Sequence, residues 1–512
     1  MPKLNLLTLY SRLCVVLSLA MMLVACGGAQ DNEDGVRSVQ GQIETLELQS
    51  ATGITPEKIQ QRDADDRPNI LVIFTDDQGY ADVGAYGVAS DIQTPNIDLL
   101  ASAGVRMTAG YSTAPQCTPS RAGLITGRYQ QRFGLDDNRH TPMPLSEVTI
   151  AERMQALGYR TGMVGKWHLE IDRNSIAYDN AALTPAEREP FHPDNHGFDD
   201  LFFGYTERWW TNYSRDGSTH EKRLEKIEDY RIEIATDAAL SFIERSADEP
   251  FFLYLNYYAP HVPLEAPDKY LKRFEHIQEL RRRYGLAMMA AIDDGVGELR
   301  QQLQELGLTD NTMIFFISDN GAPLGLYKMN EPVEDESGVW DGSLNDPWVG
   351  EKGMLSEGGV RVPYIVTWPG QLPAGLVYEK PVSTLDVAAT SLTAAKVSVP
   401  SELDGVDLLS PLQGRSDNLD SRALFWRFWS QSAIRQGPWK YLTAGDREYL
   451  FDMTGGAGGS HETLNVIGQY PGVAQGLKTQ LSEWADTLHR PGLETQTPNS
   501  AEQQWFDFYF SN

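Results

Sequence analysis

Cysteine is scarce in this chain of 512 residues, which contains only Cys14, Cys26 and Cys117. Cys14 and Cys26 lie in an N-terminal segment that we expect to be removed or processed, so Cys117 is the single cysteine of the folded body. A lone thiol forms no intramolecular disulfide, and the sequence therefore excludes a small disulfide-stabilised scaffold. The stability of the fold must come from a buried core instead.

Basic residues are also in short supply, since 43 Lys and Arg stand against 71 Asp and Glu, a net charge of −28. This balance argues against nucleic acid as a partner. It would also repel an anionic substrate, so any anion site must be a local island of Arg, Lys and His. We interpret the remaining acidity as a solvated surface suited to a salty habitat, where screening shortens the repulsion to roughly 8 Å or less.

After the N-terminus, no apolar run is long enough to span a membrane. Residues 13–24 are apolar but too short for a span, and they follow a basic stretch, which is the pattern of a signal peptide over residues 1–26. Residues 23–26, Leu-Val-Ala-Cys, resemble a bacterial lipobox, which implies cleavage before Cys26 and a lipid on its thiol. Gly27 is compatible with sorting to the outer membrane. We therefore expect a soluble body anchored in the cell envelope only through Cys26; an ordinary signal peptide is the alternative.

The rest of the chain divides by composition. Residues 27–66 are polar and poor in aromatics, which predicts a flexible tether with one short helix near 54–62. We expect residues 67–420 to form a large catalytic α/β domain and residues 421–512 a smaller α+β subdomain with an aromatic tail. Residues 505–510 of that tail either dock against the body or form a rim that stacks on sugars.

Hydrophobic periodicity predicts the fold class. Apolar runs of buried-strand type occupy residues 69–74, 251–255 and 313–317, and helical patterns occupy 149–157 and 289–306. Strands that alternate with helices indicate a large, mainly parallel sheet covered by helices on both faces. The short strand patterns at 423–426, 432–435, 439–442 and 449–452, followed by a helical pattern at 473–488, indicate a small antiparallel sheet with one helix.

Acidic and amide side chains directly follow two of these predicted strands. Asp76 and Asp77 come after the first strand, and Asp319 and Asn320 come after the strand at 313–317. In open α/β sheets the ligand site lies beyond the carboxyl ends of the strands. Oxygen ligands gathered there favour a hard divalent cation.

Cys117 stands in an unusual setting. A lone cysteine is ordinarily a small buried hydrophobe, but here the sequence reads Cys117-Thr-Pro-Ser-Arg121, and a permanent cation beside a thiol suits a reactive or modified cysteine. Together with Leu-Ile-Thr-Gly-Arg at 124–128, this segment resembles the signature of the type I sulfatases of the alkaline phosphatase superfamily. The resemblance runs from about residue 67 to the end of the chain. It implies that Cys117 is oxidised to Cα-formylglycine, whose hydrate attacks a sulfate ester.

The same resemblance implies roles for further residues. Asp76, Asp77, Asp319 and Asn320, together with the modified Cys117, would bind Ca²⁺ or, less often, Mg²⁺. Lys166 and His168 lie in a Gly-Lys-Trp-His segment that matches the family. The other matched positions are Arg121, His261 and Lys352, the last of which precedes Glu-Gly-Gly-Val-Arg-Val-Pro at 357–363.

In the family, Lys166 and Lys352 would bind sulfate, and Arg121 would orient the modified Cys117. His168 would deprotonate the hydroxyl that expels sulfate, and His261 would bind sulfate and protonate the leaving alcohol. Near-neutral imidazole pKa values suit both histidine roles. Outside this context, such lysines and histidines would be ordinary surface charges or satisfied core groups.

We therefore expect a sulfatase that acts on a sulfated carbohydrate, such as a marine algal polysaccharide or its oligosaccharides, and that needs a formylglycine-generating or anaerobic maturation enzyme. An arylsulfatase of broad specificity and a related phosphate or phosphonate ester hydrolase are the alternatives. A surface lipoprotein that binds sulfated glycans without turnover is a third. The segments 205–213 and 322–344 should overhang the pocket, and Trp209, Trp210 and Tyr213 either stack on sugars or pack their loop.

Overall fold

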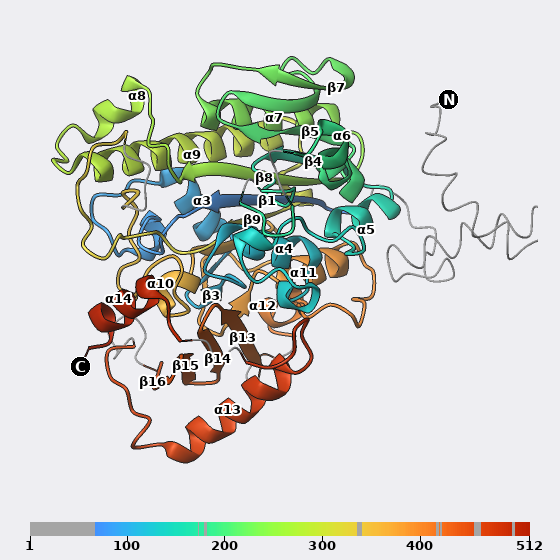
Figure 1. The fold of residues 1–512 in the computed structure, drawn as a ribbon. Helices are drawn as coiled ribbons and strands as arrows, with labels where there is room; N and C mark the ends of the chain where they lie inside the picture. Colours follow the sequence, from blue (N-terminus) through green and yellow to red (C-terminus); the bar gives the residue numbers. More distant parts are fainter. Residues whose placement is uncertain are drawn as a thin grey trace, which may run out of the picture. The chain divides into compact units, whose positions relative to one another are not determined.

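The computed structural model describes residues 67 to 511, apart from 173, 179–181, 335–339, 416–418, 420–421, 455–461 and 494–496 (Figure 1). The expected signal peptide, tether and short helix at 54–62 lie outside the described residues. The described residues belong to one compact unit. The described helices include none that is both long and apolar enough to cross a membrane.

A ten-stranded sheet forms the centre of the molecule, in the order β11-β2-β10-β9-β1-β8-β4-β5-β6-β7. Its middle is parallel, as predicted, and consists of β9 (Thr312–Ser318), β1 (Asn69–Asp76), β8 (Phe251–Pro260), β4 (Arg160–Gly165) and β5 (Asp200–Tyr205). Antiparallel pairing begins on either side with β10 (Tyr364–Thr367) and β6 (Arg208–Tyr213), and the remaining strands are β2 (Val105–Met107), β11 (Leu376–Tyr378) and β7 (Thr219–Lys226).

Helices cover both faces of this sheet (Figure 1). Leu71 and Ile73 of β1 belong to the core shared with α3 (Pro95–Ala103), α7 (Arg231–Arg245) and α9 (Leu280–Glu305). Ile70, Val72 and Phe74 point to the other face, which is covered by α4 (Cys117–Thr126), α5 (Ile150–Ala156) and α11 (Asp386–Ala394). A strand buried on both faces needs a continuous apolar run, which is why residues 69–74 were recognisable in the sequence.

The C-terminal part contains the predicted antiparallel sheet, in the order β13 (Ala423–Phe428), β14 (Gln431–Gln436), β15 (Trp439–Ala444) and β16 (Arg447–Asp452). The predicted helix is α13 (Pro471–Ala485). A second helix, α14 (Ser500–Tyr509), was not predicted, and it carries most of the aromatic tail. We keep 67–420 and 421–512 as a proposed division of the chain.

The aromatic tail docks against the body. Phe506 of α14 is 1% exposed in the core that the helix shares with the small sheet, and the Phe510 ring lies 5.1 Å from that of Tyr449.

The remaining elements are β3 (Gly110–Tyr111), β12 (Val382–Ser383), α6 (Pro185–Arg188), α8 (Asp268–Leu271), α10 (Glu357–Val360), α12 (Leu409–Leu412) and the 3₁₀ turns Gly84–Tyr86, Gln130–Phe133, Asn138–His140, Glu189–Phe191, Pro193–His196, Lys272–Phe274 and Thr309–Asn311.

Candidate active site

Four neighbouring parallel strands deliver the predicted site residues to one edge of the sheet. Asp76 ends β1 and Asp77 follows it, while Asp319 and Asn320 follow β9. Lys166 follows β4, and His261 follows β8. Because parallel strands end on the same side of a sheet, residues far apart in the sequence meet there.

Cys117 is the first residue of α4, and the helix places it against the acidic residues. One oxygen each of Asp76, Asp77 and Asp319 and the sulfur of Cys117 all lie within 4.8 Å of one another, and all four residues are buried. The Cys117 Sγ lies 3.9 Å from Asp77 Oδ1, and Asn320 Nδ2 donates to that same oxygen over 2.6 Å. The structure therefore brings the sequence-predicted metal ligands and the cysteine together.

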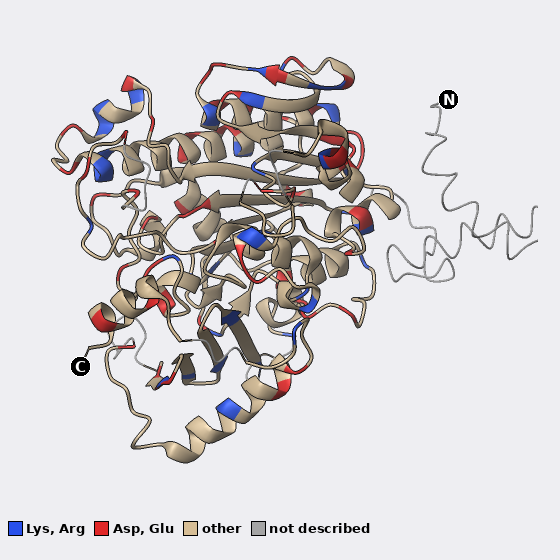
Figure 2. Ribbon diagram, viewed as in Figure 1, with Lys and Arg blue, Asp and Glu red and all other residues tan. Residues whose placement is uncertain are grey.

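Three cations surround this cluster. The Arg121 guanidinium lies 2.7 Å from Asp319 Oδ2 and 3.4 Å from Asp76 Oδ1. The Lys166 ammonium lies 2.6 Å from Asp76 Oδ2, and the Lys352 ammonium lies 2.7 Å from Asp77 Oδ2. This is the local cationic island that the acidic composition requires, and Figure 2 shows acidic residues spread over helices and loops elsewhere in the fold.

The two predicted histidines flank the cluster on different loops. His261 Nε2 lies 3.6 Å from Asp77 Oδ2, and its Nδ1 lies 2.7 Å from the Val262 carbonyl oxygen. His168 Nε2 lies 3.4 Å from Asp172 Oδ2. Burial lowers the pKa of each imidazole to about 4, with the charge of Lys166 adding to the effect at His168. Both rings are thus neutral at pH 7, and both pKa values lie below the near-neutral values that we expected.

Burial and neighbouring charges shift the pKa values of the cluster in different directions. Burial acts to raise the pKa of Asp76, but Lys166, His261 and Arg121 outweigh it and hold this pKa well below its usual range. Burial and the nearby Asp76 raise the pKa of Asp319 to about 7. Burial also raises the pKa of the Cys117 thiol well above its usual value, so an unmodified Cys117 is a poor nucleophile here.

The cluster has the donor set that a hard divalent cation requires. Asp76 Oδ1 and Asn320 Oδ1 are buried and accept no hydrogen bond from the described residues, so both oxygens can accept a further ligand. Carboxylate and amide oxygens are the ligands that Ca²⁺ and Mg²⁺ prefer, and a cation would relieve the repulsion between the carboxylates. The residues present therefore fit such an ion.

Comparisons with known proteins agree with this arrangement. A family model described as Sulfatase matches residues 68–397, and one described as N-sulphoglucosamine sulphohydrolase, C-terminal, matches residues 348–450. The chain is 35% identical over 391 residues to the N-acetylgalactosamine-6-sulfatase of Canis lupus familiaris, covering 70% of this chain and 68% of that protein. The chain belongs to the sulfatase family.

Other relatives of this sulfatase include a bacterial protein and a solved structure. An uncharacterized sulfatase of Escherichia coli (strain K12), YdeN, is 33% identical over 404 residues, covering 70% of this chain and 68% of that protein. The structure of Ps i-CgsB in complex with k-i-k-neocarrahexaose is 28% identical with a TM-score of 0.69, covering 86% of this chain and 97% of that one. The protein is thus a sulfuric ester hydrolase of the type I sulfatase group.

Sequence patterns missed several residues around the sulfatase site. Asn256 is fully buried in β8 and accepts a hydrogen bond from Arg121 over 3.1 Å. Asp172 faces His168, and the buried Arg231 of α7 donates to the His261 carbonyl over 2.8 Å. The one available signal was the polar Asn256 inside an apolar strand.

The insert between β9 and Lys352 adds a further carboxylate. Asp341 is 1% exposed, and its Oδ2 has no hydrogen-bond partner among the described residues. Burial, followed by the charge of Asp77, raises the pKa of Asp341 well above its usual value. This shift favours the protonated, uncharged form of Asp341 beside the acidic cluster.

Two of the three aromatic residues of the cluster after β5 pack inside the fold. Trp209 and Tyr213 of β6 are 0% exposed. Trp210 is partly buried, and its ring lies 5.2 Å from that of His192. For Trp209 and Tyr213, loop packing is therefore correct and sugar stacking is wrong.

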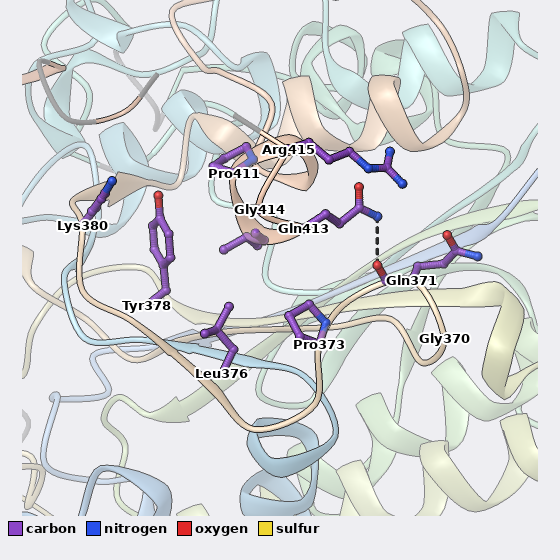
Figure 3. Close-up of a pocket in the computed structure, with 11 residues that line it drawn as sticks. Gly370, Gln371, Pro373, Leu376, Tyr378, Lys380, Pro411, Gln413, Gly414 and Arg415 are labelled. Carbon is purple, nitrogen blue, oxygen red and sulfur yellow. Dashed lines mark hydrogen bonds between the residues drawn. The ribbon is translucent and has the colours of Figure 1, made fainter. Parts of the chain in front are cut away.

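A cavity of about 920 Å³ lies beside the edge strand β11 (Figure 3). It is open and lies between residues 370–380 and 411–415, where the Gln413 amide donates to the Gln371 carbonyl over 2.8 Å. None of the ten predicted site residues lines it.

Proposed function

We propose that this sulfatase hydrolyses sulfate esters of a sulfated polysaccharide or its oligosaccharides, with Cys117 acting after conversion to formylglycine and with Ca²⁺ at the acidic cluster. The observation that carries the proposal is the position of Cys117. Its sulfur lies among three carboxylates, with the ammonium groups of Lys166 and Lys352 bound to two of them. A buried cysteine serving only as core packing would not need this charged surrounding.

The chain's own residues divide the work of binding and proton transfer. Lys166 and Lys352, which now pair with Asp76 and Asp77, would hold the sulfate oxygens, and Arg121, which pairs with Asp319 and Asp76, would fix both carboxylates next to the nucleophile. The neutral His168 would accept the proton of the hydroxyl on modified residue 117 that expels sulfate. An anionic sulfate bound next to His261 would favour the protonated imidazole. His261 would then donate a proton to the leaving alcohol.

Two groups supply chemistry that the unmodified side chains lack. The hydrate of formylglycine offers one hydroxyl to attack sulfur and a second hydroxyl from which the free enzyme is regenerated. A Ca²⁺ ion held by Asp76, Asp77, Asp319 and Asn320 would neutralise the carboxylates and polarise a sulfate oxygen, with Mg²⁺ as the alternative. Maturation by a formylglycine-generating or anaerobic enzyme is part of this proposal.

The substrate class follows from the relatives and the composition. Names among the relatives include N-acetylgalactosamine-6-sulfatase, and Ps i-CgsB is described in complex with a neocarrahexaose. The strongly acidic chain suits a salty habitat, which favours a marine algal polysaccharide. We also propose a place in the cell envelope, anchored through a lipid on Cys26.

Two alternatives differ in the reaction. A phosphonate monoester hydrolase from Silicibacter pomeroyi has a TM-score of 0.61 at 20% identity, so the fold alone does not separate sulfate from phosphorus esters. Among the described residues, the two candidate groups of metal ligands overlap at Asp76 and Cys117, and no second, separate cluster of acidic residues and histidines stands beside them. The family assignment disfavours the other alternative, a glycan-binding protein without turnover.

Turnover of paired substrates tests the reaction. We expect purified, matured protein to release sulfate from an aryl sulfate, from sulfated oligosaccharides or from both, with much slower release of phosphate from the matching aryl phosphate. Cys117→Ala should abolish turnover while keeping the fold. A clear preference for the phosphate would overturn the proposal, and so would glycan binding without any sulfate release by formylglycine-bearing protein.

Metal removal tests the cation. Removing a bound cation takes away part of the positive charge that offsets the repulsion among three buried carboxylates, so EDTA should lower both activity and thermal stability, and Ca²⁺ should restore both. Asp319→Ala should lose both responses. The matched control is Asp200→Ala, which removes a buried aspartate that pairs with Arg160 at the start of β5 and should stay sensitive to EDTA. Unchanged activity in metal-free protein would refute the assignment.

A further inference from the structure

A second cavity lies between the insert that follows β9 and the C-terminal helix α14. Its volume is about 470 Å³, which falls in the range of about 300–1,000 Å³ typical of small-molecule sites. Four aromatic side chains line it: Tyr327 and Trp348 from the insert, and Phe508 and Tyr509 from the helix. The Asn499-capped helix α14 thus presents Phe508 and Tyr509 to this cavity, while Phe506 faces the small sheet.

Two of these rings remain largely open to solvent. Tyr327 is 67% exposed and Phe508 is 45% exposed, although their ring centroids lie only 5.3 Å apart. Single exposed apolar side chains are common and need no explanation. A pair that comes from two distant parts of the chain and meets over one cavity, with its ring planes 77° apart, offers an angled apolar surface that a ligand can cover.

One buried carboxylate ties both walls of the cavity to the active site. Glu351, which is 3% exposed, accepts hydrogen bonds from the backbone N–H groups of Leu324, Gly325 and Leu326 over 2.9, 2.7 and 3.0 Å. It also accepts one from the Tyr509 hydroxyl over 3.1 Å. The next residue is Lys352, whose backbone N–H donates to the Ala322 carbonyl over 3.1 Å. The cavity therefore borders the segment that carries a proposed sulfate-binding lysine.

The insert wall is held in a costly conformation. Leu326 and Lys328 have φ angles of 60° and 49°, in the left-handed region that non-glycine residues avoid at a cost of about 1–3 kcal/mol each. Tyr327 stands between them. Such strain persists where the surroundings fix the backbone, and it commonly marks segments that clamp a ligand.

The cavity also carries paired charges beside its rings. The Lys328 ammonium lies 3.3 Å from Asp346 Oδ2, and both side chains are part-exposed. A sugar ring has an apolar face that packs on aromatic rings and an edge of hydroxyls that bond to charged groups. A sulfate on that sugar would pair with the lysine.

We propose that this cavity is a distal saccharide subsite, which binds a second sugar ring of the same sulfated chain whose ester lies at Cys117. The inference rests on the proposed function, since it assumes that the substrate is an oligosaccharide. The open cavity beside β11 is the weaker candidate, because among its described lining residues Tyr378 is the one aromatic ring and none is a predicted site residue.

Binding to protein that cannot turn over separates this inference from catalysis. The probes are disaccharides and hexasaccharides of ι-carrageenan and of chondroitin 6-sulfate, titrated calorimetrically into the Cys117→Ala protein. We expect a hexasaccharide of at least one series to bind more tightly than its disaccharide. Tyr327→Ala and Phe508→Ala should each weaken the hexasaccharide by about tenfold and leave the disaccharide unchanged. Tyr327→Trp should keep the length dependence.

The matched control is Tyr470→Ala, which removes a ring that is 43% exposed and contacts Trp439 far from the insert; it should change neither affinity. In otherwise native protein, Tyr327→Ala should leave aryl sulfate turnover unchanged. The proposal is overturned if no probe binds, if the variants weaken both lengths equally, or if neither variant weakens the hexasaccharide. Length-dependent binding in a protein that hydrolyses no sulfate ester would support the subsite and reject the proposed function.

Discussion

At the scale of single residues, the charged side chains of the site could be predicted because they stand in short motifs that resemble those of the sulfatases, several of them directly after a strand or at a helix start. Asp76, Lys166 and Cys117 all belong to such motifs, and the structure brings them together. Asn256 and Arg231 belong to none. Their contacts depend on which strand and helix pack beside the site, and this information is absent from local sequence.

Asn256 supports a specific prediction, because its side chain supplies an acceptor to the fully buried Arg121. Asn256→Ala leaves that guanidinium short of a partner, which should cost about 2 kcal/mol of unfolding free energy. Arg121 should also lose its fixed position beside Asp319, so we expect kcat to fall at least tenfold, measured with an aryl sulfate.

The matched control is Asn69→Ala, at the opposite end of the same sheet. Asn69 is 2% exposed and bonds to Thr312 and Phe251, away from the active site. This variant should lose similar stability and keep kcat. Equal losses of kcat in both variants would show that Asn256 acts only through general stability.

At the scale of elements, the buried parallel strands were predictable and the edge elements were not. β1 and β8 are buried along their whole length, so hydrophobicity alone reveals them. β7 (Thr219–Lys226) is a partly exposed edge strand with the sequence THEKRLEK, which carries no apolar alternation. α14 was missed because its aromatic residues face two different partners and give no simple helical stripe.

One element contact joins the small sheet to the active-site segment. Lys440 of β15 is 0% exposed and lies 2.8 Å from Glu357 Oε1 of α10 and 2.8 Å from Glu462 Oε1. Glu357 also pairs with Arg361 over 2.8 Å. The positive Lys440 thus pairs with two buried carboxylates. Burial acts to raise the pKa of Glu357, but the charges of Lys440 and Arg361 outweigh it and lower this pKa to about 2.

Lys440→Met should remove the cation shared by two buried carboxylates, leaving Glu357 with Arg361 and Glu462 without its ion pair to Lys440, and should lower the free energy of unfolding by about 3–5 kcal/mol. The control Lys478→Met breaks an exposed pair with Glu448 and should change stability by no more than about 0.5 kcal/mol. Chemical denaturation of both variants makes the comparison. A loss in Lys440→Met no larger than in the control would contradict the structural role of this contact.

At the scale of the whole molecule, composition set correct limits: a scarce thiol, few basic residues and a large apolar core. It did not indicate how stability depends on pH, because that depends on which histidines become buried. His196 is 1% exposed against the Trp167 ring, and burial lowers its pKa from 6.5 to about 4. Between pH 4 and pH 6.5 the unfolded chain therefore binds more protons at His196 than the folded chain does. As a result, His196 makes the protein less stable as the pH falls from 6.5 towards 4.

His196→Phe should remove this contribution. Relative to its difference from the native protein at pH 7.5, the variant should gain on the order of 2 kcal/mol of unfolding free energy by pH 5. Thermal or urea unfolding of both proteins at the two pH values measures the change. A difference that stays constant with pH would show that His196 is not kept neutral by the fold.

The central claim is that sulfate ester hydrolysis depends on a modified Cys117, and peptide mass spectrometry of active protein tests it most directly. The peptide that contains Cys117 should carry formylglycine, and the modified fraction should rise in proportion to sulfatase activity across preparations made with and without a maturation enzyme. Full activity in protein whose Cys117 is entirely an unmodified thiol would contradict the account.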